Sequence, residues 1–237
     1  MLTLPIEIIQ HVTNFCDLRN TLNIMMTCQK YNQHLYIYSI DKKNSYFIND
    51  DILCQNKFRF LREIHVGPFV KQIGFLKNLK KVIIDQKSII GQDSMQDLDL
   101  IELKIFNNKN IKHVAHMKNL KILYIYGKCG IDQNEINKLN VYELCVSFNP
   151  YVHDVSHMTR LRRLHARCGL YRLGIGSEYC EYNIDQAGIK NLDLRYLDIV
   201  GNTKIITVSH MKNLGILIHN VPQLFYFNKT QLCITSE

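Results

Sequence analysis

A ten-residue segment recurs three times in this 237-residue chain, and no other feature limits its fold as strongly. The copies begin at Val114, Val155 and Val208, and each places a His-Met pair ahead of leucines at a constant spacing. The first two copies lie 41 residues apart, and the third follows after 53, which is the same period plus an insertion of 12. A repeated unit of this length cannot bury its apolar face alone and must stack on its neighbours. The sequence therefore predicts one continuous core built from repeating units.

Each long period contains two half-repeats of about 20 residues that share an L-x-x-L-x-I spacing. Apolar residues at alternate positions predict a short strand with one buried face. An Asn stands at the ninth position of three copies (Asn108, Asn149 and Asn202), where its side chain can satisfy backbone groups as the chain turns. The pattern begins at Leu61, Leu79, Leu100, Leu120, Val141, Leu161, Leu194 and Leu214.

This spacing resembles the leucine-rich repeat, L-x-x-L-x-L-x-x-N, over roughly residues 61–220. The resemblance implies an α/β fold in which a leucine-rich repeat solenoid occupies residues 61–237. We expect the solenoid to be irregular, because Lys128 stands where Asn would be and His219 occupies an apolar position. The extra residues of the last period form an insertion at about 170–183.

The first 40 residues follow a helical pattern instead. Pro5 stands at the expected first turn of a helix, where its missing N–H costs little, and apolar residues follow at three- and four-residue steps. A second apolar, helix-compatible stretch runs from Leu18 to Leu35. We therefore expect a helical module over residues 1–40, joined to the repeats by a transition segment over residues 41–60.

Two short motifs in this module resemble an F-box. They are Leu-Pro-x-Glu followed by Ile-Ile at the start, and Thr-Cys-Gln-Lys-Tyr at the end, with Tyr in place of the family's usual Trp. The resemblance implies that the chain is the substrate-recognition subunit of a cullin-RING ubiquitin ligase, in which the module docks onto a Skp-type adaptor and the repeats capture the target. The adaptor-binding residues that it implies are Leu4, Pro5, Glu7, Ile8, Ile9, Cys28 and Tyr31.

The amino-acid composition indicates the kind of genome that encodes the chain. The chain has 30 Ile and 22 Asn against three Ala, a bias typical of an A/T-rich genome. An F-box with repeats in such a composition resembles the proteins encoded by giant DNA viruses of amoebae. That resemblance implies a protein of the host cytoplasm that redirects host ubiquitination.

The helical module has a second interpretation, as a cap that shields the first repeat, because the ends of solenoids need capping. The two interpretations differ in one observable. A cap has its apolar face fully covered within the monomer, whereas an F-box leaves part of that face exposed for a partner. Without an adaptor, the chain would be a free-standing protein-interaction scaffold.

The outward-facing side of the repeat strands is the expected target surface. Its third and fifth strand positions should point outward on the concave side, and flanking basic residues together with a net charge of +8 predict a basic ledge that favours an acidic protein target. The alternative is that this charged face is simply solvated and binds no target. Nucleic acid is a third candidate, but Glu63, Glu102 and Glu143 interrupt the basic stripe and would repel phosphates. The expected target-binding residues are Arg162, Arg163, His165, Tyr171 and Tyr196.

The sequence carries no set of residues typical of catalysis or metal binding. It contains no Gly-rich phosphate loop, no Gly-x-Ser-x-Gly and no His-Glu-x-x-His. None of its eight cysteines forms a Cys-x-x-Cys pair, and the repeated His-Met pairs are most simply packing or turn residues. We therefore expect no enzymatic activity, no cofactor and no metal. Apolar runs are too short to span a membrane, so a soluble protein with free thiols is expected.

Overall fold

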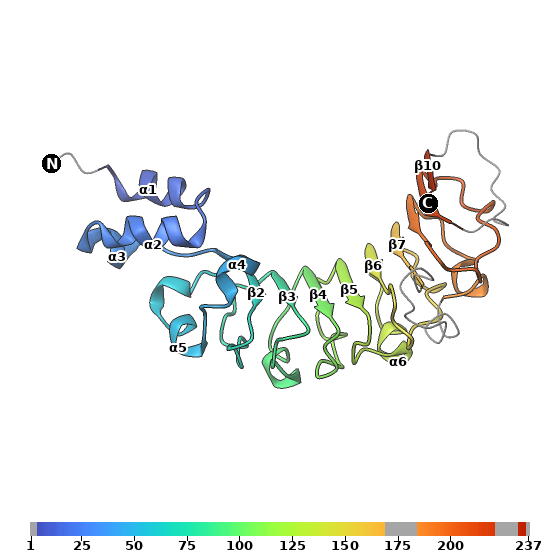
Figure 1. Cartoon of the computed structure of the whole chain (residues 1–237), viewed down its shortest axis with the longest axis horizontal. Coiled ribbons are helices and arrows are strands. Elements are labelled where there is room, and N and C mark those ends of the chain that lie inside the picture. The colour runs from blue at the N-terminus through green and yellow to red at the C-terminus, as the bar shows by residue number, and fades with distance from the viewer. Residues whose placement is uncertain (1–3, 169–183, 221–231, 236–237) are drawn as a thin grey trace. The chain divides into compact units, whose positions relative to one another are not determined.

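The computed structural model describes residues 4–168, 184–220 and, for the backbone alone, 232–235. The chain is a mixed α/β protein of parallel strands and short helices (Figure 1). It divides into two compact units, residues 1–101 and 102–237. The boundaries expected at residues 40 and 60 both fall inside the first unit.

Three helices open the first unit: α1 (Ile6–Thr13), α2 (Leu18–Met26) and α3 (Gln29–His34). Pro5 precedes the first turn of α1 rather than lying in it, and its carbonyl oxygen accepts the N–H groups of Ile8 and Ile9. Asp17 caps α2 by accepting the N–H of Asn20 at 2.8 Å. Cys28 is extended and divides the helix-compatible stretch from Leu18 to Leu35 into α2 and α3.

The rest of the first unit combines short helices with three parallel strands. Strand β1 (Ser39–Ile40) pairs with β2 (Glu63–Val66), and β2 pairs with β3 (Lys81–Ile84). The expected transition segment holds α4 (Lys42–Ser45), α5 (Asp50–Leu53) and the 3-10 helix η1 (Asn56–Phe58), and a further 3-10 helix, η2 (Gln92–Ser94), follows β3. Because Leu53 and Phe58 are almost fully buried, this segment belongs to the core.

The second unit is a parallel sheet whose strands follow one another in chain order. Its elements are β4 (Glu102–Phe106), β5 (Ile122–Tyr126), α6 (Gln133–Ile136), β6 (Glu143–Cys145), β7 (Arg163–His165), η5 (Ala187–Ile189), β8 (Tyr196–Asp198), β9 (Ile216–His219) and β10 (Leu232–Thr235). Each strand from β2 to β9 begins two residues after a predicted pattern start. The strand prediction is therefore confirmed.

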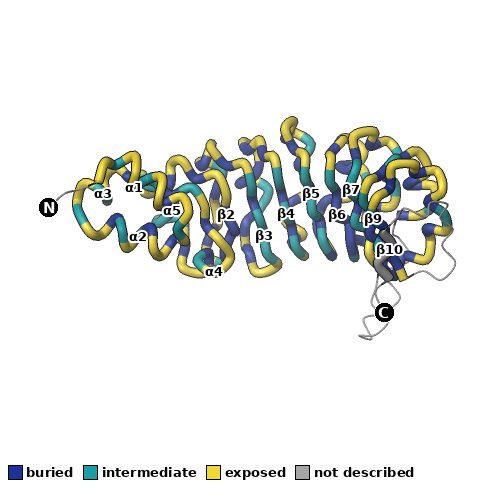
Figure 2. Tube along the Cα trace, turned by 90° about the horizontal axis from the view of Figure 1, so that it is seen from above, coloured by how far each residue is buried: buried dark blue, intermediate teal, exposed yellow. Residues whose placement is uncertain are grey.

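One leucine from each strand of β4 to β9 forms the spine of the core of the second unit. The register pairs these leucines from strand to strand, and each side chain is fully buried. Figure 2 shows the alternation along β4 and β5, where buried positions are flanked by half-buried ones. The inward position predicted from the repeat is confirmed for Leu103, Leu123, Leu144, Leu164, Leu197 and Leu217.

The repeated asparagines satisfy backbone groups at the turns, as the sequence predicts. Asn149 is fully buried; its amide donates to the carbonyl of Ile125, and its Oδ1 accepts the N–H of Tyr151 at 2.8 Å. Asn202, also fully buried, donates to the carbonyls of Ala166 and Ile184. Buried side chains therefore hydrogen-bond one half-repeat to the next.

Polar residues of the other half-repeat make equivalent bonds. Gln133 Oε1 accepts the N–H groups of His153 and Asp154, and Gln186 Oε1 accepts those of residues 206 and 207, one half-repeat further on. The His-Met pairs also face backbone: His157 Nε2 lies 3.2 Å from the carbonyls of residues 136 and 139, and His210 Nε2 lies 3.1 Å from that of residue 189. The prediction that the repeated histidines are packing or turn residues is confirmed for His157 and His210.

Candidate functional site

A largely exposed apolar stripe runs along the outside of α1. Leu4, Ile8 and Val12 are 55%, 51% and 45% exposed, and Phe15, just beyond the helix, is 81% exposed. The opposite side of α1 is held by polar contacts, because the Gln10 amide bonds both the carbonyl and the N–H of residue 36. We call Leu4, Ile8, Val12 and Phe15 the α1 stripe.

The adaptor-binding residues implied by the F-box resemblance separate into two groups. Those on and before α1 are exposed, except for Ile9, which is half-buried. Tyr31 belongs to α3, which packs against α2, and Cys28 directly precedes α3; both residues are half-buried. Sequence analysis left Val12 and Phe15 out of the adaptor-binding set, although Val12 follows Ile8 at the four-residue spacing that places both on one helix face.

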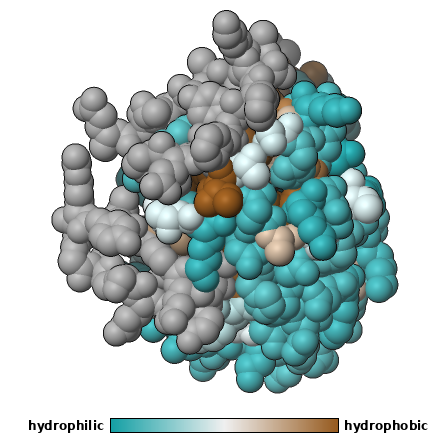
Figure 3. Space-filling model, turned by 90° about the vertical axis from the view of Figure 1, so that its right-hand side faces the viewer, coloured by the Kyte–Doolittle hydropathy of each residue, from teal (hydrophilic) through white to brown (hydrophobic). Residues whose placement is uncertain are grey.

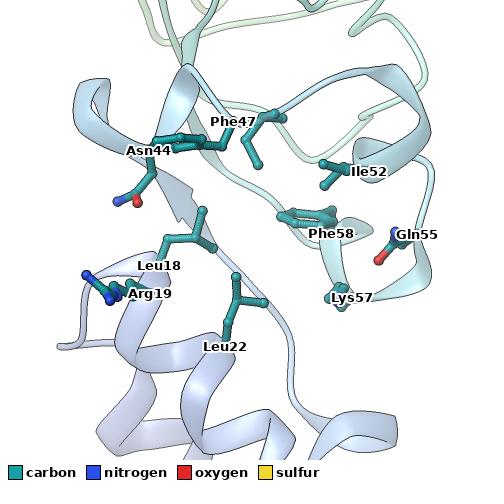
Figure 4. Close-up of a pocket in the computed structure, with 10 residues that line it drawn as sticks. Leu18, Arg19, Leu22, Asn44, Phe47, Ile52, Gln55, Lys57 and Phe58 are labelled. Carbon is teal, nitrogen blue, oxygen red and sulfur yellow. The ribbon is translucent and has the colours of Figure 1, made fainter.

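A cavity of about 490 Å³ lies between α2 and the segment that carries α4, α5 and η1. Leu18 and Leu22 of α2 point toward Phe47, Ile52 and Phe58 across it (Figure 4). Arg19 and Lys57 stand at its edge, and no Asp or Glu is among the described residues that line it. No sequence pattern indicates this cavity, because its two walls lie about 30 residues apart along the chain and share no motif.

A second hollow, of about 390 Å³, opens on the strand face of the second unit over β4 to β8, and we call it the strand-face hollow. It exists because β6 and the residues after it carry the small side chains Cys145 and Ser147, whereas the neighbouring strands carry large ones. The described residues that line it are Lys104, Phe106, Tyr124, Tyr126, Cys145, Ser147, Phe148, His165, Arg167, Cys168, Tyr196, Asp198 and Val200.

Two groups of tilted aromatic rings line the strand-face hollow. His165 lies between Tyr124 and Tyr196, with ring centroids 5.7 and 4.7 Å away. Tyr126 lies next to Phe148 at 5.1 Å. Because β6 separates β5 from β7, the Tyr124 and His165 rings lean toward each other above Cys145, which is only 4% exposed. Cys145 and Asp198, which is 1% exposed, lie on this face at the expected strand positions, but neighbouring side chains cover both.

The charges on this face are paired with one another. Arg167 Nε lies 2.6 Å from Asp198 Oδ2, and Arg163 Nε lies 3.0 Å from Glu143 Oε2 while its guanidinium stacks on the Tyr196 ring at 4.6 Å. A third pair joins Lys104 and Glu102 at 2.9 Å. Acidic side chains at the same strand positions thus neutralise the expected basic ledge over β4 to β8. Arg162 turns back and donates to the backbone carbonyls of residues 159 and 161.

Burial favours the neutral forms of the phenols and the thiol in the strand-face hollow. It raises the pKa of Tyr124, and a short hydrogen bond to Glu143 raises it further. Burial also raises the pKa of the Cys145 thiol, against hydrogen bonds with Ser147 that lower it. For Asp198, burial raises the pKa, but hydrogen bonding with His165 and Arg167 outweighs burial and lowers it. The hollow therefore holds phenols, a thiol and a carboxylate, which suits recognition better than nucleophilic chemistry.

The expected target-binding residues are only partly brought together. His165 and Tyr196 line the strand-face hollow, Arg163 contacts Tyr196, and Arg162 does not line it. Tyr171 and the insertion at 170–183 lie outside the residues that the structure describes. Tyr126, Phe148 and Arg167 also line the hollow but were not in the expected target-binding set, and Arg167 lies two residues beyond the end of β7.

Comparisons with known proteins add no assignment: no protein family model and no curated protein matches this chain. Over residues 4–168 and 184–220, no group of three or more His, Cys, Asp or Glu side chains could hold a metal ion. Helices within the described ranges are all too short or too polar to cross a bilayer. Figure 3 shows one end of the second unit, where the described surface is mostly hydrophilic.

Proposed function

We propose that this protein is the substrate-recognition subunit of an F-box type cullin-RING ubiquitin ligase, in which the helical module binds a Skp-type adaptor and an irregular leucine-rich repeat solenoid binds the target. The observation that carries the proposal is the α1 stripe. A helix that served only as a cap would turn its apolar face toward the repeats. Here the one described residue of α1 that is buried is Thr13, and the aliphatic residues Ile8 and Val12 face outward.

An uncovered stripe of this kind favours a partner. Burying a Leu, Ile or Val side chain contributes about 1.5–3 kcal/mol, so a partner that covered Leu4, Ile8 and Val12 would gain several kcal/mol from them. Two aliphatic side chains one turn apart on α1, with a further large apolar side chain beyond each end of the helix, also match a helix-based docking mode. The Leu-Pro-x-Glu start, which resembles an F-box, directs the proposal to a Skp-type adaptor.

The solenoid part of the proposal draws on the second unit. Parallel strands in chain order, a leucine spine in register and asparagines bonded to neighbouring turns are what a leucine-rich repeat requires. Such repeats present their strand face to a partner. The strand-face hollow gives that face a concave, aromatic-lined feature of the size used for recognition.

Co-purification with a Skp-type adaptor tests the docking claim. The variant Leu4→Ala, Pro5→Ala, Ile8→Ala should lose adaptor capture, because it removes half of the α1 stripe and the residue before the first helical turn. A second variant, Ile8→Ala with Val12→Ala, keeps Pro5 and should weaken binding by about 2–4 kcal/mol.

The matched control is Phe69→Ala with Ile89→Ala, which removes two equally exposed apolar side chains elsewhere in the first unit. Its adaptor recovery should equal that of the wild type. Equal recovery of adaptor by the wild type and both α1 variants, with circular dichroism showing that all are folded, would sink the F-box proposal and leave a free-standing protein-interaction scaffold. Nucleic-acid binding is not proposed, because the cations of the strand face over β4 to β8 are paired with carboxylates.

A further inference from the structure

We propose that the edge of the second unit at which its strands begin binds an extended segment of the target protein, about six residues long and rich in Asp or Glu. The inference rests on the proposed function in taking the second unit as the target-binding part. It places the acidic target beside the strand face rather than on it, because the cations of that face are already paired with carboxylates. Three features carry it: the alignment of the edge residues, their charge and the length of the row.

Backbone hydrogen bonds align the residues of this edge. Five short segments form it, and each ends directly before one of the parallel strands β5 to β9. Their last residues make a ladder, in which the N–H of each residue donates to the carbonyl of the one before it at 2.8–3.0 Å. The segments are residues 117–121, 137–142, 158–162, 190–195 and 211–215, and the ladder runs through Lys121, Tyr142, Arg162, Arg195 and Gly215.

The corners that precede this ladder are tied together in the same order. Asn140 Oδ1 accepts the N–H of Arg160 at 3.0 Å, and Asp193 Oδ1 accepts the N–H of Asn213 at 3.1 Å. Successive corners therefore keep the spacing of the strands, and the cations on them form a second row beside the ladder.

Positive charge dominates the five segments. They contain eight Lys or Arg residues and one acid, Asp193. Seven of the cations are exposed and Arg162 is half-buried. Among the described residues, only Lys138 forms an ion pair, with Glu135. We call the eight cations the basic edge: Lys118, Lys121, Lys138, Arg160, Arg162, Lys190, Arg195 and Lys212.

Asp193 shows that a carboxylate is stabilised at this edge. Its hydrogen bonds with Asn213 lower the pKa of this carboxyl, and the charges of Arg162 and Lys212 lower it further. One Asp neutralises only a small part of the positive charge of the edge. Carboxylates from a partner would therefore find cations that no acid of the described chain occupies.

The length of the ladder sets the length of the ligand. Neighbouring strands lie about 4.8 Å apart, so five rungs span about 19 Å, which an extended peptide covers with about six residues. Arg side chains in the row can hold a carboxylate through two N–H groups. Single-stranded nucleic acid fits less well, because its bases need aromatic platforms and Tyr142 is the one aromatic residue of the five segments.

The chain contains no tryptophan, so indole fluorescence reports on a tryptophan-labelled probe alone. The probe is an end-blocked peptide of Trp-Gly-Gly followed by six Glu, titrated with the full chain. We expect its anisotropy to rise on binding, and the analogue with Gln in place of each Glu to bind at least about tenfold more weakly. Affinity for the Glu probe should fall at least about tenfold between about 0.05 and about 0.5 M NaCl, because exposed charges are screened.

Two variants test the basic edge itself. Lys121→Gln, Arg160→Gln, Arg195→Gln and Lys212→Gln combined should reduce probe affinity at least about tenfold, and the fold should be retained because all four residues are exposed. Asp193→Asn removes the acid of the edge but keeps an acceptor for the N–H of Asn213. It should tighten binding by about two- to threefold.

The matched control removes the same charge elsewhere. Lys43→Gln, Lys71→Gln, Lys87→Gln and Lys109→Gln combined change four exposed residues outside the five segments. Because this variant keeps the basic edge, its affinity for the Glu probe should stay within about twofold of wild type. Circular dichroism of both variants checks that they are folded.

Three results would overturn the inference: no binding of the Glu probe by the folded wild type, equal affinity for the Glu and Gln probes, or equal losses in the edge variant and its control. Displacement of the probe by a heptathymidylate, which matches its charge, at lower concentration than by the six-Glu peptide would also overturn it, in favour of nucleic acid. Adaptor co-purification separates these failures from failure of the proposed function. A chain that captures the adaptor but ignores the Glu probe contradicts only the basic edge.

Discussion

Glu135 shows how a single buried charge can hold two half-repeats together. Its side chain is 4% exposed, and Oε1 accepts the N–H groups of Val114 and Ala115 at 2.7 and 2.8 Å while Oε2 pairs with Lys138. Burial raises the pKa of this carboxyl, but the backbone donors and Lys138 outweigh burial and lower it from 4.5 to about 2. The charged form is therefore the one that the folded state stabilises.

A pH-dependent loss of stability follows from that lowered pKa. The contribution is fully present above the unfolded-state pKa of 4.5 and is lost as pH falls toward about 2. We expect Glu135→Gln to lower the free energy of unfolding by about 2–3 kcal/mol at pH 7, and the difference from wild type to shrink toward zero as pH approaches 2. Urea unfolding at a series of pH values measures both quantities.

The control for Glu135 is Glu7→Gln, on the exposed side of α1, which should change the unfolding free energy at pH 7 by less than about 0.5 kcal/mol. If the difference in unfolding free energy between the wild type and Glu135→Gln stays constant down to pH 2, the charge of the Glu135 carboxylate does not contribute to stability.

At the scale of elements, the strands were predictable and the strand-face hollow was not. The same apolar pattern occurs eight times along the chain. A position that is ambiguous in one copy can therefore be assigned from the other copies. The hollow depends on how side chains from three strands lean over one another, and Cys145 is small by exception to the pattern. Its charge pairing could have been found, because Glu143 and Arg163 occupy the same strand position one half-repeat apart.

The helices were less predictable for a different reason. α2 and α3 are separated because Cys28 alone adopts an extended conformation within a helix-compatible stretch. No Pro or Gly stands at that position to indicate the end of a helix. Exposure of the α1 stripe also could not be known in advance, because an amphipathic pattern shows which side chains share a face but not what covers that face.

The leucine spine gives the element-scale prediction. Leu123→Ala, Leu144→Ala and Leu164→Ala should each lower the free energy of unfolding by about 2–5 kcal/mol, because each leaves a cavity at a fully buried position. Lys121→Ala, at an exposed position just before β5, should cost less than about 0.5 kcal/mol. Chemical denaturation of the four variants compares them, and similar losses at all four would mean that the strand register is wrong.

At the scale of the whole molecule, the two proposed binding functions belong to different units. The α1 stripe lies in residues 1–101, and the strand-face hollow lies in residues 102–237. We expect Leu164→Ala, which weakens the second unit, to leave adaptor co-purification within about twofold of wild type at a temperature where the chain remains folded. The same variant should lower the recovery of the target protein once the second unit begins to unfold. Parallel loss of both activities would contradict this division.

Pairing only between successive strands has a consequence for inheritance. From β4 to β9, each hydrogen-bonded neighbour is also the next strand along the chain, and the pairing of Leu164 with Leu197 keeps its register although extra residues separate those strands. A gene that encodes such a protein can gain or lose a whole period by unequal recombination without disturbing the strands on either side. Length is therefore a trait that selection can change in steps of about 41 codons, while the leucine at the centre of each strand stays fixed.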